Sequence, residues 1–440
     1  MKQELYDLAA KAIKIAKSAG ANDCRVSIGG ERFVEISYRD RKPENIKEAA
    51  TKGLRVEIFV NQRYSSQSTS DLRPESLKTF IENAIASTKL LAEDPFRTLP
   101  DPKYYQGRPA VDLKQYDPDY ENVTPESRHS FVKAIEESCL AKGGDKVISA
   151  TAGGYDSRSE QLLMTSNGFD GYQEASVFYG FAEMTAKDEG DRRPAEYSVA
   201  VALSRKALPK PEEIGAEAAL RALGLLGSKK IKTETLPIII ENRVVARFGD
   251  GFMQAMFGRS IQQKQSFLAD KKGQKVASQV MTLIDDPFIP GALGSGTFDG
   301  EGMTAKKRVI IDAGVLKEFY VDWYYSRKLG WEPTTGRPSN LILPPGKRSV
   351  KEIMKDLGRG IFITGFIGGN SNSTTGDTSI GIVGQLFDKG EAVHPVSEMN
   401  IADNHLKIWQ RLAEAANDPY PYSTERVPSL VFTDVVVSGI

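Results

Sequence analysis

Residues 365–377, GFIGGNSNSTTGD, combine several glycines with a dense run of short polar side chains. Glycine supplies backbone conformations with positive φ, and Asn, Ser, Thr and Asp side chains hydrogen-bond exposed backbone groups. This composition favours an ordered loop that forms a site. A long structural connection between two strands is the alternative, and composition leaves it open.

The segments around this loop predict the fold class. Apolar, β-rich runs at 360–366 and 378–387 predict two buried strands, and period-two alternation at 54–60 indicates a half-buried antiparallel strand. These patterns indicate an α+β fold with two domains, 1–230 and 231–440, each of mixed, mainly antiparallel β-sheet packed with helices. Further strands are predicted at 24–28, 33–38, 147–152, 161–165, 172–184, 198–203, 236–241, 308–312, 315–320, 391–399 and 430–437, and helices at 1–20, 74–88, 124–143, 212–226, 242–256 and 404–416.

The composition limits the classes of partner. Lys plus Arg and Asp plus Glu are equal at 58 each, so the overall charge favours neither nucleic acid nor an anionic membrane as a direct partner. No apolar run approaches the length of a membrane span. Cys24 and Cys139 lack CxxC spacing, which suits a reducing compartment. We therefore expect a soluble, cytoplasmic protein.

Few side chains offer obvious chemistry. His129, His394 and His405 are the only histidines, and none forms an HExxH pair, so each is interpreted as structural or as a surface residue. There is no GxSxG motif, and the glycine-rich segment 294–302 lacks the GK[ST] ending of a phosphate-binding loop. The residues by themselves predict a site-like loop without catalytic machinery.

Two carboxylate pairs are weighed as cation ligands. Asp285 with Asp286, and Asp299 with Glu301, offer the oxygen atoms that hard cations prefer. Adjacent acids before Pro287 more often cap helices or form turns, and this structural role is the favoured interpretation.

Several motifs together resemble one family. The stretch 365–377 is followed by GEAVHPVSEMNIADN at 390–404, and is preceded by DAGVLKEFYVDWYYSRKLG at 312–330 and TSNG at 165–168. With the loop around residues 299–301, these segments closely resemble the TldD/PmbA family, also called modulator-of-DNA-gyrase proteins. The resemblance covers nearly the whole chain.

The resemblance implies a heterodimeric zinc metallopeptidase in which the TldD branch carries an HExxxH helix and a cysteine near its C-terminus. Counting back from the similar stretch 266–286 places the motif on GDGFMQ at 249–254, where Gly249, Asp250 and Gln254 stand at the His, Glu and His positions. No cysteine follows Cys139. The chain therefore resembles the PmbA (TldE) branch, which implies no catalytic residue and no metal in this chain, with zinc held by the partner.

The leading hypothesis is a noncatalytic subunit that pairs with a TldD-like chain and acts on unfolded peptides. One alternative is direct protein binding that modulates DNA gyrase. Another is an independent hydrolase that uses Asp250 or Asp299, and the isolated chain could form a homo-oligomer. Candidates for the peptide cleft or subunit interface are Gly368, Gly369, Asn370, Thr375, Gly376 and Asp377.

Overall fold

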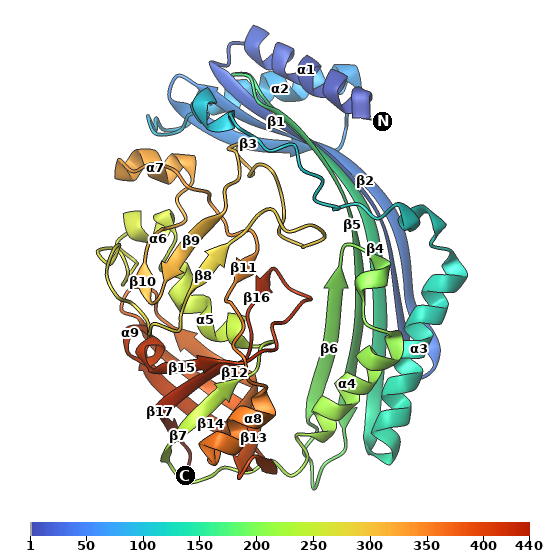
Figure 1. Ribbon diagram of the computed structural model, residues 1–440. Helices are drawn as coiled ribbons and strands as arrows, with labels where there is room; N and C mark the ends of the chain where they lie inside the picture. The colour runs from blue at the N-terminus through green and yellow to red at the C-terminus, as the bar shows by residue number, and fades with distance from the viewer. Residues whose placement is uncertain (1) are drawn as a thin grey trace.

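A long, curved antiparallel sheet arches over the rest of the chain in the computed structural model, which describes residues 2–440 (Figure 1). Its strand order is β3-β2-β1-β4-β5-β6. The long strands of this arch are β1 (Asp23–Arg39), β2 (Lys42–Val60), β4 (Val147–Thr165) and β5 (Asp170–Ala186). The other elements of this half are β3 (Arg63–Thr69), β6 (Ala195–Ala202), α1 (Lys2–Ser18), α2 (Pro74–Thr88), α3 (Pro125–Gly143) and α4 (Pro211–Leu223).

The two faces of the arch have different partners because side chains alternate along each strand. One face of β1 carries two apolar cores. Val26 and Ile28 pack with α1 and α2 in the first core, and Val34 and Ile36 pack with α3 and α4 in the second. Full burial of each such side chain contributes about 1.5–3 kcal/mol. Arg25, on the opposite face of the same strand, points to the inside of the arch, where it lines a cavity. The helices therefore cover the outer face, whereas the inner face is free to line the cavity at the end that carries Arg25.

The structure corrects two strand predictions. The segments 24–28 and 33–38 are one strand, β1, and the segments 147–152 and 161–165 are one strand, β4. The apolar alternation stops between the two helix-covered cores, but the backbone ladder continues there through pairs such as Gly29 with Gly53. Backbone hydrogen bonds do not need apolar side chains, so hydrophobic patterning underestimates the strand length.

The second half of the chain lies under the arch and closes a sheet on itself. The strand order is β14-β13-β12-β7-β17-β15, and an additional pairing of β14 with β17 completes a ring of strands. A smaller sheet has the order β10-β9-β8-β11-β16. Both sheets are mainly antiparallel, with β7 parallel to β12 and β11 parallel to β16, and together with the packed helices they confirm the α+β prediction. The strands are β7 (Glu234–Ile240), β8 (Leu283–Asp285), β9 (Arg308–Asp312), β10 (Val315–Leu316), β11 (Leu341–Ile342), β12 (Arg359–Ser371), β13 (Asp377–Asp388), β14 (Glu391–Asn404), β15 (Leu412–Ala415), β16 (Glu425–Arg426) and β17 (Leu430–Ser438), and the helices are α5 (Val245–Gln254), α6 (Gly258–Gln262), α7 (Trp323–Leu329), α8 (Val350–Leu357) and α9 (His405–Ile408).

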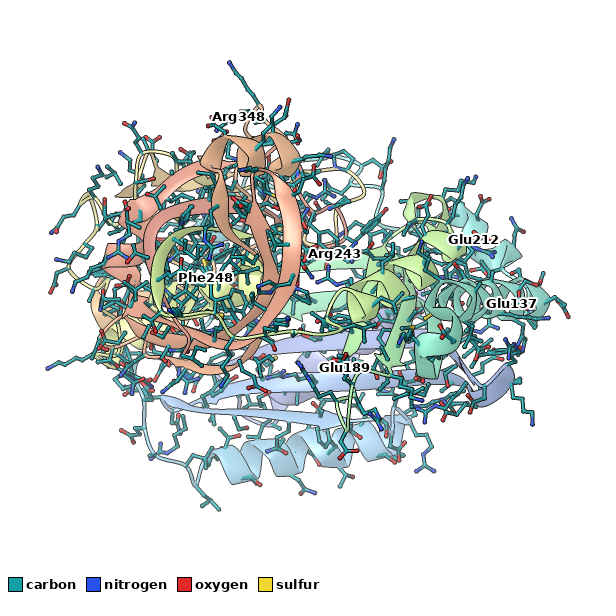
Figure 2. All side chains as sticks on the ribbon, turned by 90° about the horizontal axis from the view of Figure 1, so that it is seen from below. Glu137, Glu189, Glu212, Arg243, Phe248 and Arg348 are labelled. Carbon is teal, nitrogen blue, oxygen red and sulfur yellow. The ribbon has the colours of Figure 1, made fainter. Side chains whose placement is uncertain are left out.

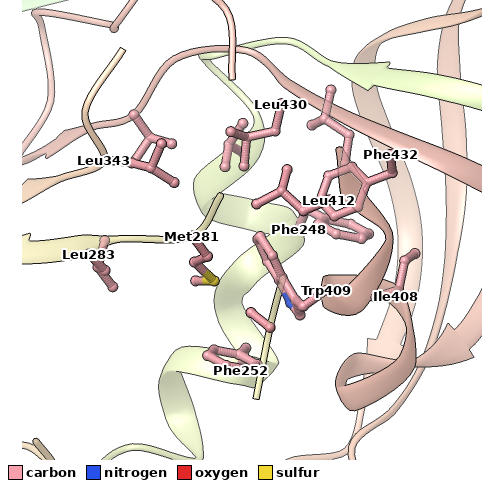
Figure 3. Packing of buried hydrophobic residues seen from close by; sticks show 14 of the residues in the cluster. Phe248, Phe252, Met281, Leu283, Leu343, Ile408, Trp409, Leu412, Leu430 and Phe432 are labelled. Carbon is pink, nitrogen blue, oxygen red and sulfur yellow. The ribbon is translucent and has the colours of Figure 1, made fainter. Parts of the chain in front are cut away.

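Helix α5 supplies the core of this ring. Seen from below, Phe248 lies in the middle of the ring of strands (Figure 2). Its ring centroid is 5.6 Å from that of Trp409 and 5.5 Å from that of Phe432, and Phe252 packs on the same tryptophan at 5.7 Å (Figure 3). Aromatic packing of this kind fixes both the position and the rotation of the helix.

The helix predicted at 404–416 is wrong beyond its first turn. Helix α9 ends at Ile408, and β15 then pairs with β17, placing Leu412 opposite Phe432 and Ala415 opposite Leu430. Leu412 and Ala415 are buried in the ring core. The edge of β17 offers these residues backbone partners and burial together, so tertiary pairing overrides their helix propensity.

The loop predicted at 365–377 is shorter than expected. The flanking strands are confirmed, but β12 continues to Ser371 and β13 begins at Asp377. The strand register shifts between Ile367 and Asn370, and Gly369 there has a φ of 98°. A Cβ on Gly369 would lie 2.9 Å from the Ser379 carbonyl oxygen, so the bulge excludes other residues.

Among residues 2–440, no helix combines the length and the apolar character that a membrane crossing requires.

Candidate functional site

Helix α5 carries the three positions at which the resemblance places metal ligands. Asp250 and Gln254, four residues apart, lie on its exposed side, whereas Gly249 is buried. A Cβ on Gly249 would meet nothing closer than the Trp409 ring at 3.9 Å. Residues 2–440 contain no group of three or more His, Cys, Asp or Glu side chains placed to hold a metal ion. The residues present therefore do not fit a tetrahedral zinc site.

A second carboxylate, absent from the sequence prediction, lies near this helix. Burial raises the pKa of Glu425 in β16, and the negative charge of Asp250 raises it further. Burial also raises the pKa of Asp250, which nearby Arg247 partly offsets. The two acids come from segments far apart in the sequence, so no local motif could have revealed the pair.

The buried side of α5 packs on a hydrogen-bonded Ser–His pair. Ser371 Oγ lies 2.7 Å from His405 Nε2, and the imidazole is fully buried. Gly251 provides the space, since a Cβ there would overlap Ser371 Oγ and lie 2.9 Å from His405 Nε2. The end of β12 and the start of α9 are thereby locked against α5.

The hydrogen bonds of His405 exclude a serine nucleophile at this place. Trp409 Nε1 is a donor only, and at 3.2 Å it donates to His405 Nδ1. The proton of the neutral ring is then on Nε2, which donates to Ser371 Oγ. Burial lowers the pKa of His405 to about 4, so the ring stays neutral. A nitrogen that already carries a proton cannot accept the serine proton, and the pair is structural.

His405 should make stability pH-dependent. Its pKa in the folded protein is about 4, below its usual value of 6.5. Between pH 6.5 and 4 the unfolded chain therefore binds more protons than the folded protein, and stability falls as the pH falls. Between pH 7.5 and 5 we expect the wild type to lose about 2 kcal/mol more unfolding free energy than His405→Gln. Urea unfolding at both pH values measures this difference. Equal losses in both proteins would contradict the buried, neutral state of the imidazole.

The predicted loop residues separate into two groups. Gly368, Gly369 and Asn370 lie at the exposed end of β12. Arg247 on α5 donates to the Gly368 carbonyl at 3.2 Å, which brings this group next to the helix that carries the motif positions. This hydrogen bond connects the exposed end of β12 to α5.

The second group is held by Asn404. Its amide donates to the Thr375 carbonyl and to Asp377 Oδ1, each at 2.9 Å, and the hydrogen bonds from Asn404 and Thr375 lower the pKa of Asp377. The backbone N–H of His405 donates to the Gly376 carbonyl at 2.7 Å. These contacts stabilise the turn itself.

The remaining candidates have structural partners. Asp286 accepts from the N–H of Phe288 at 2.9 Å, in agreement with the favoured turn interpretation. Asp285 is instead the last residue of β8 and pairs with Arg308 on β9 at 3.1 Å. His129 Nδ1 lies 3.0 Å from the Tyr38 hydroxyl. Asp299 and Glu301 are different, because they line a large cavity.

Comparisons with known proteins agree with this architecture. Residues 24–88, 118–226 and 233–439 match, in turn, domain 1, the central domain and the C-terminal domain of the PmbA/TldA metallopeptidases. Metalloprotease PmbA of Escherichia coli O157:H7 is 26% identical over 440 residues, covering 99% of this chain and 96% of the relative.

Two solved structures extend the similarity to the fold. A Bacteroides thetaiotaomicron protein named for modulation of DNA gyrase is 35% identical, with a TM-score of 0.96 and 99% of each chain covered. TldE of Thermococcus kodakarensis has a TM-score of 0.86 at 23% identity, covering 98% of this chain and all of that one. The resemblance predicted from the sequence is confirmed: this chain belongs to the PmbA/TldD family of metallopeptidase-related proteins.

Proposed function

We propose that this chain is the noncatalytic, TldE-like subunit of a cytoplasmic zinc metallopeptidase that acts on unfolded peptides. The observation that carries the proposal is that α5 lacks metal ligands. Gly249 has no side-chain atom that could bind zinc, and the buried side of the helix packs on an aromatic core. The carboxyl groups of Asp250 and Glu425 influence one another there, but within residues 2–440 they belong to no group of three or more potential metal ligands. In this proposal the partner supplies the zinc, the activated water and the general base.

The exposed end of β12 is the part of this chain that we assign to the cleft or to the partner interface. Gly368, Gly369 and Asn370 are exposed, and the adjacent Ile367 keeps 57% of its surface accessible. An exposed strand end can pair with an extended peptide or with a strand of another subunit, because backbone pairing needs little sequence specificity. We keep Thr375, Gly376 and Asp377 as residues that shape this end.

Affinity purification of the tagged chain from its native cells tests the proposal. We expect a stoichiometric partner with an HExxxH motif, and peptide cleavage by the eluate that a chelator abolishes. Ile367→Arg should reduce recovery of the partner at least tenfold, whereas Val436→Arg, a comparably exposed position on β17, should not. A homo-oligomer without such a partner would contradict the subunit assignment.

The alternatives have separate signatures. Peptide cleavage by the purified chain alone, lost in Asp250→Asn or Asp299→Asn, would instead establish an independent hydrolase. The Bacteroides relative is named for modulation of DNA gyrase. Capture of gyrase by the isolated chain, without the metallopeptidase partner, would support that role for this protein.

A further inference from the structure

A cavity of about 970 Å³ lies between the inner face of the arch and the second half of the chain. Its walls come from β1, β2 and β3 on one side and from the glycine-rich segment 294–302 on the other. Gly29 and Gly53 pair across β1 and β2 and leave its floor without side chains at that place. The volume is at the upper end of the range for small-molecule sites.

Two of the buried cations in the cavity are neutralised by their own partners. Arg25 contacts Glu57 at 2.5 Å, and Arg308 contacts Asp285 at 3.1 Å. The first ion pair joins β1 to β2 in the arch, and the second joins β8 to β9 in the smaller sheet. Each pair is therefore part of the sheet that forms a wall of the cavity. The carboxyl groups of the glycine-rich segment therefore need a different source of positive charge.

Asp299 and Glu301 are partly buried carboxyl groups with unused acceptor atoms, and 22% of the Glu301 side chain remains exposed in the cavity. Asp299 Oδ1 accepts from the N–H groups of Glu301 and Met303 at 2.9 and 3.0 Å, but within residues 2–440 its buried Oδ2 has no hydrogen-bond partner. Glu301 Oε2 accepts from the N–H of Trp323 at 2.8 Å. Its Oε1 lies 4.0 Å from Arg25 Nη1, beyond hydrogen-bond distance.

The titration of the pair reflects this shortage of positive charge. Burial raises the pKa of Glu301 to about 8, with a further contribution from the negative charge of Asp299, and burial raises the pKa of Asp299 to about 6. At neutral pH the pair retains a proton that a bound cation would displace. The charged groups that face the two carboxyls are Arg25 and Glu57 from the sheet, Arg308 from β9, Asp285 from β8 and Asp322 ahead of α7.

The more exposed part of the cavity is positively charged, in contrast to the carboxyl groups of Asp299 and Glu301. Arg55, Lys306 and Arg337 line it and are exposed to solvent. In the part of the chain that the structure describes, neither Lys306 nor Arg337 forms a salt bridge, and Arg55 is 3.8 Å from Glu57. An anionic group would gain from these cations, whereas a polycation would be repelled.

We propose that this cavity binds a primary ammonium group at Asp299 and Glu301, on a ligand whose other end is anionic and faces Arg55, Lys306 and Arg337. The amino terminus of a short peptide and a lysine side chain both supply that ammonium group. The site lies within this chain and goes beyond the subunit role proposed above. It can therefore be tested without the partner, and the two proposals can fail separately.

Calorimetric titration of the isolated full-length chain with tetraalanine tests the site. We expect binding with release of a proton, seen as a heat that depends on the ionisation enthalpy of the buffer, and an affinity that rises from pH 6 to 7.5. Spermidine, which has ammonium groups but no anionic end, should bind more weakly. Absence of binding by every ammonium-bearing probe, or binding without proton release, would overturn the proposal.

Glu301→Gln is the decisive variant because Gln has the shape of the protonated acid and still accepts from the N–H of Trp323. It should bind tetraalanine about tenfold or more weakly, while Glu391→Gln, at an exposed carboxylate on β14, should match the wild type. The melting temperature of Glu301→Gln at pH 7.5 should be equal to or above that of the wild type, because the variant removes the cost of burying an ionisable carboxyl group beside Asp299. Unchanged affinity in this folded variant would exclude the assigned role of Glu301.

Two further peptides identify the source of the ammonium group. Loss of binding on N-acetylation of tetraalanine supports the peptide amino terminus as the ligand. Binding of N-acetyl-Ala-Lys-Ala supports the lysine side chain. Equal binding of tetraalanine and N-acetyl-tetraalanine would show that no ammonium group is recognised, and would contradict the proposal.

Discussion

Gly251→Ala is expected to lower the unfolding free energy by about 2–3 kcal/mol, a typical cost of forcing an extra carbon into a packed core. The new Cβ would overlap Ser371 Oγ and lie 2.7 Å from Ser371 Cβ and 2.9 Å from His405 Nε2. Rotation of the serine hydroxyl would not remove the contact with its Cβ, and it would break the 2.7 Å hydrogen bond to His405. Either α5 or the end of β12 must therefore move.

Gly249→Ala is the matched control in the same helix. Its Cβ would have the Trp409 ring as its nearest neighbour at 3.9 Å, which is ordinary van der Waals contact. Alanine is favoured over glycine in a helix by about 1 kcal/mol, so this variant should be equal to or more stable than the wild type. Urea unfolding of the three proteins measures the difference. Equal destabilisation by the two alanines would show that helix flexibility, not the Ser371–His405 contact, determines the effect.

Arg221→Ala should cost about 3–5 kcal/mol, the range for removing one partner of a buried ion pair. The guanidinium of Arg221, on α4, is 2.8 Å from Glu241 and 3.6 Å from Glu196, and donates to the Thr364 carbonyl at 2.7 Å. Its side chain is only 12% exposed, and burial already raises the pKa of Glu196. Removal of Arg221 would leave two buried carboxylates without a counter-charge and would weaken the junction between α4, β6, β7 and β12.

Arg359→Ala is the control for this prediction. Arg359 contacts Glu234 at 3.1 Å, but its side chain is 42% exposed, and exposed pairs contribute between 0 and about 1 kcal/mol. Chemical unfolding at low and moderate salt compares the two variants. If Arg221→Ala cost no more than Arg359→Ala, the buried network would not hold the two halves of the chain together.

The sequence alone determined the features that depend on neighbouring residues. The Thr124 hydroxyl caps α3 by accepting from the N–H of Ser127, and Asn167 with Gly168 forms the hairpin turn between β4 and β5. Such signals act within a few residues, so they survive in any tertiary context. The α+β class and the family resemblance were likewise predicted from the sequence.

Only the tertiary structure decided which distant residues meet. Ser371 and His405 pair against Gly251, and Arg25 Nη1 lies 4.0 Å from Glu301 Oε1 in the lining of the cavity. Within the predicted helix 404–416, residues 412–415 form strand β15 because they pair with the edge of β17. Contacts of this kind depend on chain closure and burial, and neither has a signature in a local stretch of sequence.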